Sequence, residues 1–263
     1  MLRVGMKRRL QVSALLVIGV LGYAAFLRPA PGLRCTLGAV TVMTHNDGPD
    51  AWVAVRSEGS GCRLRLKGVN VRQVLLCRLD GQMRLLLLTT DSTDAVRMFS
   101  VDNGVHEVRR GISGDLHPWK LDVADVDGDG REDIAVGVYK KARFHPVMAN
   151  RLFIYGWDGQ DIYAKWLGSR LSRPFTDFVL ADFGSGVRLA AIEETRDGKN
   201  ELAVYKWDGF GFTREWTGCH ARSLSELSVR GSHGGHILVM RRDRSYRSYT
   251  WDAKQSSLKE VKP

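Results

Sequence analysis

Short runs of alternating apolar and polar residues recur along most of this chain, and glycine-containing turns separate them. The pattern is clearest in four segments and weaker in an earlier fifth: 74–90, 121–138, 178–194, 226–241 and 40–56. A period of two places every second side chain on the same face of a strand, so each segment predicts a β-hairpin. Sustained helical periodicity is absent after residue 28. The body is therefore expected to be all-β.

A second hairpin follows each of the four clearer segments. Three of these hairpins enclose an Asn-Gly or Asp-Gly turn, at 103–104, 158–159 and 208–209. Such dipeptides are strong hairpin signals, so one unit holds four short strands in roughly 50 residues. A single sheet of this kind cannot bury both faces, and the units must stack. Residues 40–263 are therefore predicted to form a β-propeller of about five blades, the first degenerate, with an open β-sandwich as the alternative.

The first 28 residues have a different character. Five positive charges and no acid lie there, at Arg3, Lys7, Arg8, Arg9 and Arg28. Residues 10–27 are 18 consecutive uncharged positions, which just reaches the length needed to span a bilayer. Basic residues before such a stretch predict a cytoplasmic N-terminus and an exported body. We expect residues 1–28 to be a basic head and signal-anchor helix and residues 29–39 to be a linker. If the segment is instead a cleaved signal peptide, the body is secreted.

The charge of the body limits the classes of partner. The chain carries a formal net charge of +10, but five of its 39 basic residues lie in the head. A mildly basic body does not indicate nucleic-acid binding. We expect the membrane to be one partner, through the N-terminal helix, and a protein or an envelope glycan to be the other. The expected location is outside the cytoplasm, in the periplasm or at the cell surface.

Four cysteines could form disulfides in an exported body: Cys35, Cys62, Cys77 and Cys219. Three pairings are possible, and the Cys62–Cys77 pair is the one that the predicted neighbouring strands favour. Buried free thiols are an equally good interpretation. A C-x-x-C spacing is absent from the sequence, which disfavours a zinc or redox site.

The most distinctive chemistry lies in residues 125–133, DVDGDGRED. Aspartates stand at positions 1, 3, 5 and 9 of this segment, and Gly130 stands at position 6. A dense set of carboxylates around a glycine turn is typical of a loop that binds a hard divalent cation. The β-branched run after it, 134–138, predicts a strand. The sequence therefore predicts a structural ion in a β-protein, with a solvated acidic turn as the alternative.

The segment Ala124–Val138 resembles the FG-GAP/VCBS-type repeats of integrin α-subunit propellers and many bacterial surface proteins. In that family the D-x-D-x-D-G-x-x-D loop joins two strands of a blade and binds calcium. The resemblance extends as a pattern over residues 70–263, but one copy alone carries the complete loop. It implies one Ca²⁺ site. Its ligands would be the carboxylates of Asp125, Asp127, Asp129 and Asp133 with the backbone carbonyl of Arg131.

The longest predicted loop is 140–150, between two strands of the third unit. Functional residues concentrate in such loops on a rigid scaffold. An aromatic side chain among basic ones makes this segment the first candidate for a partner contact. The candidate residues are Lys140, Lys141, Arg143 and Phe144.

Catalytic motifs are missing from the sequence. Gly184-Ser185-Gly186 lacks the spacing of a hydrolase elbow, and the adjacent Glu193 and Glu194 point to opposite faces of a predicted strand. The expected function is therefore recognition of a protein or an envelope component by a membrane-anchored, exported propeller. The alternative is an enzyme that acts on an envelope polysaccharide, because propeller active sites are assembled from loops far apart in the sequence.

Overall fold

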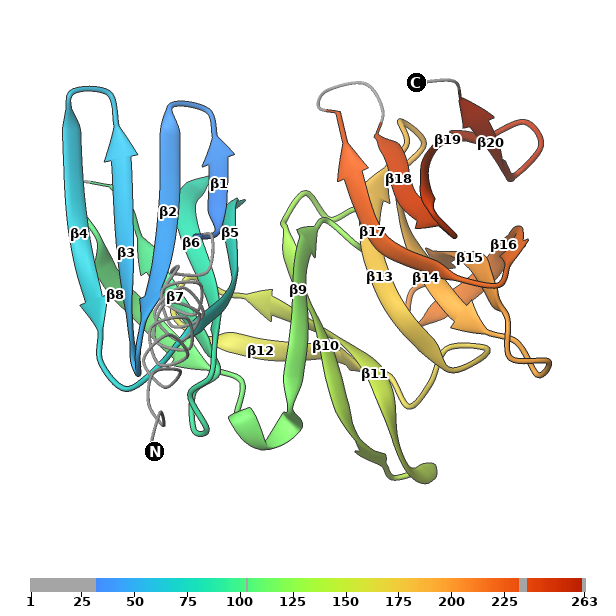
Figure 1. The fold of residues 1–263 in the computed structure, drawn as a ribbon, viewed down its shortest axis with the longest axis horizontal. Helices are drawn as coiled ribbons and strands as arrows, with labels where there is room; N and C mark the ends of the chain where they lie inside the picture. Colours follow the sequence, from blue (N-terminus) through green and yellow to red (C-terminus); the bar gives the residue numbers. More distant parts are fainter. Residues whose placement is uncertain (1–31, 103, 232–235, 262–263) are drawn as a thin grey trace, which may run out of the picture.

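The computed structural model describes residues 32–102, 104–231 and 236–261, which form twenty strands and one short 3-10 helix. The strands make five antiparallel sheets, and each sheet consists of four strands that are consecutive in the chain. The sheets follow one another in chain order, as Figure 1 shows. The all-β organisation and the four-stranded unit predicted from the alternation are confirmed.

The strands of each sheet have the following bounds. The first sheet contains β1 (Arg34–Leu37), β2 (Val40–Asp47), β3 (Asp50–Ser57) and β4 (Ser60–Leu66). The second contains β5 (Val71–Leu79), β6 (Gln82–Thr89), β7 (Val96–Ser100) and β8 (His106–Gly111), and it is followed by the helix η1 (Gly114–Leu116). The third contains β9 (Pro118–Ala124), β10 (Asp133–Ala142), β11 (His145–Trp157) and β12 (Ile162–Leu167). The fourth contains β13 (Phe175–Asp182), β14 (Val187–Glu194), β15 (Asn200–Trp207) and β16 (Phe212–Ala221). The fifth contains β17 (Leu224–Arg230), β18 (Ile237–Arg242), β19 (Ser245–Asp252) and β20 (Ser257–Val261).

Local sequence explains why these segments become hairpins. The leucine run 85–88 in β6 is fully buried, as expected for a short apolar strand that is covered on both faces. The turn from β5 to β6 places Asp80 at φ +50° and Gly81 at φ +72°. Two consecutive positive φ angles indicate a type I′ turn, whose twist matches that of a hairpin. Glycine adopts this conformation without steric cost.

The apolar core lies between successive sheets. Four clusters of buried side chains occur in the described part of the chain, and each joins two neighbouring sheets. Between the first two sheets, for example, Val53 and Leu66 pack in one cluster with Leu85 and Phe99. The first and fifth sheets stand apart at the two ends of the row and share no strand (Figure 1). Each sheet is therefore stabilised by its neighbours in the stack.

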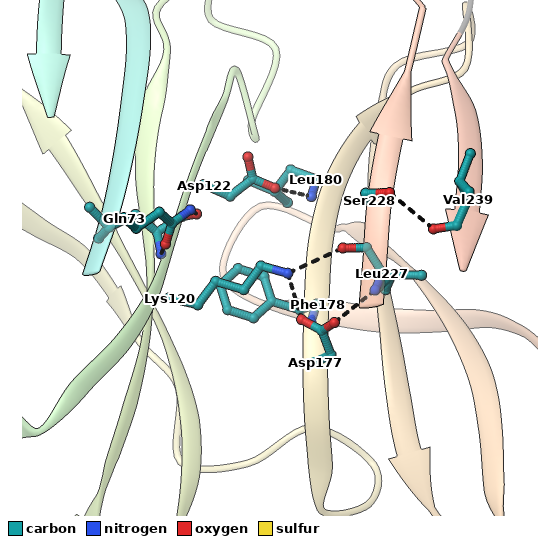
Figure 2. A network of polar contacts seen from close by, with 10 residues as sticks. Gln73, Lys120, Asp122, Asp177, Phe178, Leu180, Leu227, Ser228 and Val239 are labelled. Carbon is teal, nitrogen blue, oxygen red and sulfur yellow. Dashed lines mark hydrogen bonds and ion pairs between the residues drawn. The ribbon is translucent and has the colours of Figure 1, made fainter. Parts of the chain in front are cut away.

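Polar side chains fasten the innermost strands of the second, third and fourth sheets to one another (Figure 2). The side-chain amide of Gln73 in β5 donates to Leu121 O at 2.7 Å and accepts from Leu121 N at 2.8 Å. Asp122 of β9 accepts a hydrogen bond from Leu180 N of β13 at 2.7 Å. Burial raises the pKa of Asp122 to about 6. These contacts fix the position of each sheet relative to the next, although the sheets share no strand.

A lysine extends this arrangement to the fifth sheet (Figure 2). Asp177 of β13 accepts from Leu227 N of β17 at 2.8 Å. Lys120 Nζ of β9 donates to Asp177 Oδ1 at 2.5 Å and to Leu227 O at 3.4 Å. Hydrogen bonds to charged groups contribute about 1.5–3 kcal/mol each. Lys120 therefore ties together the innermost strands of three sheets.

Two details differ from the sequence expectation. Strand β1 lies inside the predicted linker 29–39, so the first sheet starts at Arg34 and has four strands like the others. All four cysteines are free thiols, and the Cys62–Cys77 disulfide does not form. Cys77 is buried between the second and third sheets, whereas Cys62 packs between the first and second. The two thiols therefore lie on opposite faces of the second sheet.

The signal-anchor helix expected in residues 1–28 lies outside the described residues. Within the residues that the structure describes, no helix has the length and apolar character needed to cross a membrane.

Candidate cation site and contact hairpin

The acidic loop 125–133 joins β9 to β10 in the third sheet. Asp125 organises it, because its Oδ1 accepts from Gly128 N at 2.8 Å and Asp129 N at 3.0 Å. Its Oδ2 accepts from Gly130 N at 2.9 Å. Gly128 and Gly130 have φ angles of +76° and +86°, which side-chain-bearing residues rarely adopt. The two glycines let the backbone curl around the Asp125 carboxylate.

Three carboxylates of this loop converge. Oxygen atoms of Asp125, Asp127 and Asp133 lie within 4.8 Å of one another. Asp133 is 2% exposed at the start of β10 and also accepts from Val126 N at 3.2 Å. Such oxygens suit a hard divalent cation. The structure thus brings together three of the residues that the sequence predicted as ligands.

The other two predicted ligand residues, Asp129 and Arg131, are exposed at the surface of the loop. The side chain of Asp129 is 45% exposed, and its Oδ1 accepts from Arg131 N at 2.8 Å. Arg131 is exposed as well. The Asp129 carboxylate therefore supports the shape of the loop and is not one of the three that converge, whereas the Arg131 carbonyl stays a predicted ligand.

Lys165 of β12 reaches the same carboxylates. Its Nζ lies 2.6 Å from Asp127 Oδ2, 2.8 Å from Asp133 Oδ1 and 3.6 Å from Asp129 Oδ2. Burial lowers the pKa of Lys165, but hydrogen bonds to Asp127 and Asp133 raise it by more, and the net shift is upward. The charged ammonium therefore offsets part of the negative charge of the loop. The motif could not reveal Lys165, because the lysine lies in a different hairpin.

Glu132 connects the acidic loop to the second sheet. Its Oε2 accepts from the backbone N–H of Arg78 in β5 at 2.8 Å, and burial raises the pKa of Glu132. The contact places the loop at the boundary between two sheets. Spacing alone could not identify this role, because the D-x-D-x-D-G-x-x-D pattern leaves the position of Glu132 open.

The predicted contact segment 140–150 is largely a β-hairpin and not a loop. Strands β10 and β11 continue through it and leave Arg143 and Phe144 as the turn. Phe144 is 84% exposed, and the Arg143 guanidinium carbon lies 5.6 Å from the centre of its ring. Further exposed residues follow the two strands: Tyr139, Lys141, Val147 and Met148. The predicted contact residues thus stand on a hairpin that extends beyond the rest of its sheet (Figure 1).

Arg151 accounts for the length of this hairpin. The residue is 1% exposed. Its guanidinium donates to the backbone carbonyls of Lys140 at 3.3 Å, His145 at 3.2 Å and Val147 at 2.7 Å. Five N–H donors in a planar group suit this kind of bridging. A buried arginine in a strand gives no sequence signal of its own, because alternation alone would place it on the solvent face.

A cavity of about 540 Å³ lies at the base of the hairpin, between the second and third sheets. Polar and aromatic residues dominate its lining, among them Arg72, Asp91, Asp115, His117, Trp119 and Tyr139. Asp91 Oδ1 accepts from Thr93 N at 2.9 Å and Thr93 Oγ1 at 2.8 Å, and these bonds hold the pKa of Asp91 below its ordinary value. Asp91 therefore stays ionised near neutral pH and is poorly suited to act as a general acid.

Comparison with known proteins identifies one repeat in the chain. Residues 117–140 match the model of the FG-GAP repeat. They comprise β9, the acidic loop and most of β10. A search of curated protein sequences gave no match.

Solved structures share the fold at low sequence identity. A proposed 6-phosphogluconolactonase from Bacteroides uniformis has a TM-score of 0.54 at 12% identity, over 87% of this chain and 68% of that one. A protein from Lactobacillus plantarum has a TM-score of 0.54 at 12% identity, over 89% and 70% of the two chains. An arginine-to-alanine mutant of AofleA from Arthrobotrys oligospora has a TM-score of 0.50 at 13% identity, over 88% and 70%. At these identities the likeness concerns the fold alone.

The sequence resemblance and the fold point to the same type of protein. Five stacked four-stranded sheets form a propeller-like array, and the similar structures are of propeller type. The repeat match falls on the sheet that carries the complete acidic loop. The resemblance is therefore confirmed: residues 117–140 are an FG-GAP repeat within a propeller-like all-β chain.

Proposed function

We propose that this protein is a binding module of the cell envelope, and that it contacts its partner through the β10–β11 hairpin. The observation that carries the proposal is the 84% exposure of Phe144 at the tip. Val147 and Met148 on β11 of the same hairpin are exposed as well, and exposed apolar groups beside charged residues are typical of an interaction site. Lys140, Lys141 and Arg143 favour a partner with an acidic surface, because complementary charges speed and orient association.

Membrane anchoring is part of this proposal. Its support is the basic head of residues 1–28 and the uncharged stretch 10–27. A signal anchor of this kind would hold the propeller-like body on the outer side of the membrane. Cleavage of the same segment as a signal peptide would release the body into the periplasm or the medium.

A calcium ion at the acidic loop is a second part of the proposal. The convergence of Asp125, Asp127 and Asp133 within 4.8 Å supports it, as does the match of this segment to the FG-GAP repeat. The resemblance adds Asp129 and the Arg131 carbonyl as further ligands. Calcium would provide the positive charge that such closely spaced carboxylates require. It would also compete with Lys165, because both cations need oxygens of Asp127 and Asp133.

Photo-crosslinking in intact cells tests the contact hairpin. A photoreactive phenylalanine analogue replaces Phe144, and mass spectrometry identifies the crosslinked products. The same analogue at Phe210 is a matched control, because Phe210 is 83% exposed in the β15–β16 turn of the fourth sheet. We expect a discrete protein adduct at position 144 that is absent at position 210.

The basic residues supply the second arm of this test. Replacing Lys140, Lys141 and Arg143 together by serine should reduce the adduct without changing the melting temperature, because surface substitutions rarely change stability by more than about 0.5 kcal/mol. Equal labelling from positions 144 and 210, or from the wild-type and the serine variant, would contradict the proposed surface.

Action on an envelope polysaccharide is the second candidate function, and the cavity at the base of the hairpin favours it. Trp119 and Tyr139 supply aromatic groups there, and Asp115 and His117 supply polar ones, a combination that suits sugars. The ionised state of Asp91 favours binding over acid catalysis. Incubation with purified envelope polysaccharide, followed by measurement of new reducing ends, distinguishes the two. Turnover that is lost in Asp115→Asn or His117→Ala would replace the recognition proposal by the enzymatic one.

A further inference from the structure

The side chain of Lys165 occupies the place that the FG-GAP resemblance assigns to calcium. Its ammonium contacts Asp127 at 2.6 Å and Asp133 at 2.8 Å. These distances are those of charge-assisted hydrogen bonds. The side chain is 16% exposed, so water screens the contacts only in part. The loop thus contains a cation that belongs to the chain.

A β-bulge directs Lys165 toward the loop. Ile154 of β11 pairs with Trp166, and the next residue, Tyr155, pairs with Ala164. Lys165 is therefore the extra residue of β12, opposite no single partner. A bulge re-aims the side chain of the extra residue. The position of the lysine is consequently a property of the backbone and not of a flexible surface side chain.

The fourth sheet has a matching corner, where the corner of a sheet is the turn between its first two strands together with the residues that contact this turn. Asp133, the first residue of β10, pairs with Ala124 at the end of β9. Arg188 near the start of β14 pairs with Ala181 near the end of β13. The two residues thus hold matching places after the turn between the first two strands of their sheets.

The bulge recurs as well. Val204 of β15 pairs with Trp216 and Tyr205 pairs with Arg214, which leaves Glu215 as the extra residue of β16. Glu215 therefore matches Lys165. Both sheets place a charged side chain at the same bulge, but the charge has the opposite sign.

The fourth corner uses its own internal cation. Arg188 Nε lies 3.1 Å from Glu215 Oε2. Its Nη1 donates to Ser185 O at 2.7 Å and Gly186 O at 2.9 Å, so the guanidinium binds the carbonyls of the turn. The third and the fourth sheet thus each have a cationic side chain that holds the turn between their first two strands.

We propose that Lys165 is the resident cation of the acidic loop and that a divalent cation binds there only by displacing the ammonium. The third sheet then folds without metal, and Lys165 weakens any calcium binding. The second half of this statement rests on the proposed calcium site, whereas the first half does not. The same carboxylates serve both occupants.

The test compares the melting temperatures of the full chain and three variants in EDTA and in millimolar CaCl₂. Wild type should melt at the same temperature in both solutions. In EDTA, Lys165→Gln should melt about 5–10 °C lower, because it leaves the buried carboxylate of Asp133, and Asp127 beside it, without a cation. Lys165→Arg keeps the positive charge, so its melting temperature should fall much less. Lys199→Gln, which removes an ion pair to Asp197 at 2.6 Å with both side chains more than half exposed, should change little.

Calcium distinguishes the two halves of the proposal. Lys165→Gln should regain its stability in CaCl₂, and calorimetry should show calcium binding at least about tenfold tighter than in wild type. If Lys165→Gln does not fold in EDTA, Asp127→Asn in the same chain should restore folding by removing one of the unbalanced charges. If Lys165→Gln loses stability in EDTA and calcium does not restore it, Lys165 is still the cation of the loop, but the proposed calcium site is wrong.

Two results would overturn the inference itself. One is a Lys165→Gln variant whose melting temperature in EDTA equals that of wild type. The other is a wild-type protein that gains as much stability from calcium as the variant does. In either case the ammonium would not be the cation on which the folded loop depends.

Discussion

The corner after β9 in the third sheet is closed by aspartates around a lysine, whereas the matching corner after β13 in the fourth sheet is closed by an arginine on backbone carbonyls. In the third, Lys165 lies 2.8 Å from Asp133. In the fourth, Arg188 lies 3.1 Å from Glu215. The backbone register and the bulge are the same, and the acid and the base have exchanged places. The fold fixes where a charged pair stands, and the side chains decide which member is the cation.

The difference has a consequence for metal binding. The third corner offers converging carboxylates that a divalent cation could share once the lysine leaves. The fourth corner offers carbonyls that the Arg188 guanidinium already uses, and its turn contains a single acid, Asp182. A competition between a metal and a side chain is therefore expected in one sheet and not in the other. The repeat match to the third sheet alone agrees with that distinction.

The largest expected effect comes from removing the fourth-sheet cation. Arg188→Met leaves Glu215 and the turn carbonyls without their donor, and it should cost about 3 kcal/mol of unfolding free energy in urea titrations. Calcium should not restore the loss, because the corner lacks converging carboxylates. Replacing Glu215 by methionine in the same chain should recover most of it, since an apolar pair of similar volume often replaces a buried ion pair without cost. Recovery of Arg188→Met by calcium would break the distinction between the two corners.

The sequence predicted the sheets better than it predicted their contacts. Alternation and glycine turns are local, and the segment 121–138 contains all that is needed to recognise β9, the acidic loop and β10. Strand β1 was missed because Arg34–Leu37 is only four residues long and is nowhere fully buried. Lys165 was missed because its partners lie in another hairpin and a bulge sets its direction. Pairings between hairpins depend on three-dimensional packing, which a single strand pattern does not contain.

The half-buried carboxylate of Asp122 extends the comparison to the innermost strands. Lys120 pairs with Asp177 at 2.5 Å, and the neighbouring Asp122 keeps a pKa of about 6 because of burial. The folded state holds the Asp122 proton more tightly than the unfolded state does, so this group favours folding at low pH. That contribution is lost as the pH rises from about 4 to about 6.

Asp122→Asn should remove this pH dependence. The unfolding free energy of wild type should fall relative to the variant by on the order of 2 kcal/mol across that window, and the difference should be constant above it. Urea titrations of both proteins at several pH values measure the effect. Parallel curves for the two proteins would mean that the Asp122 carboxyl has the same pKa in the folded and the unfolded state, and that burial does not shift it.

The smallest effect separates a lysine-held loop from a calcium-held one. Asp129 is 45% exposed and lies 3.6 Å from Lys165, and asparagine can still accept the hydrogen bond from Arg131 N. Asp129→Asn should therefore change the unfolding free energy by about 0.5 kcal/mol or less, in EDTA and in CaCl₂ alike. In the calcium-binding arrangement that the family resemblance implies, Asp129 is a ligand, and its loss should cost stability only when calcium is present. A calcium-specific loss in Asp129→Asn would show that metal displaces Lys165 in the wild-type protein, and that the third corner differs from the fourth in its occupant as well as in its charges.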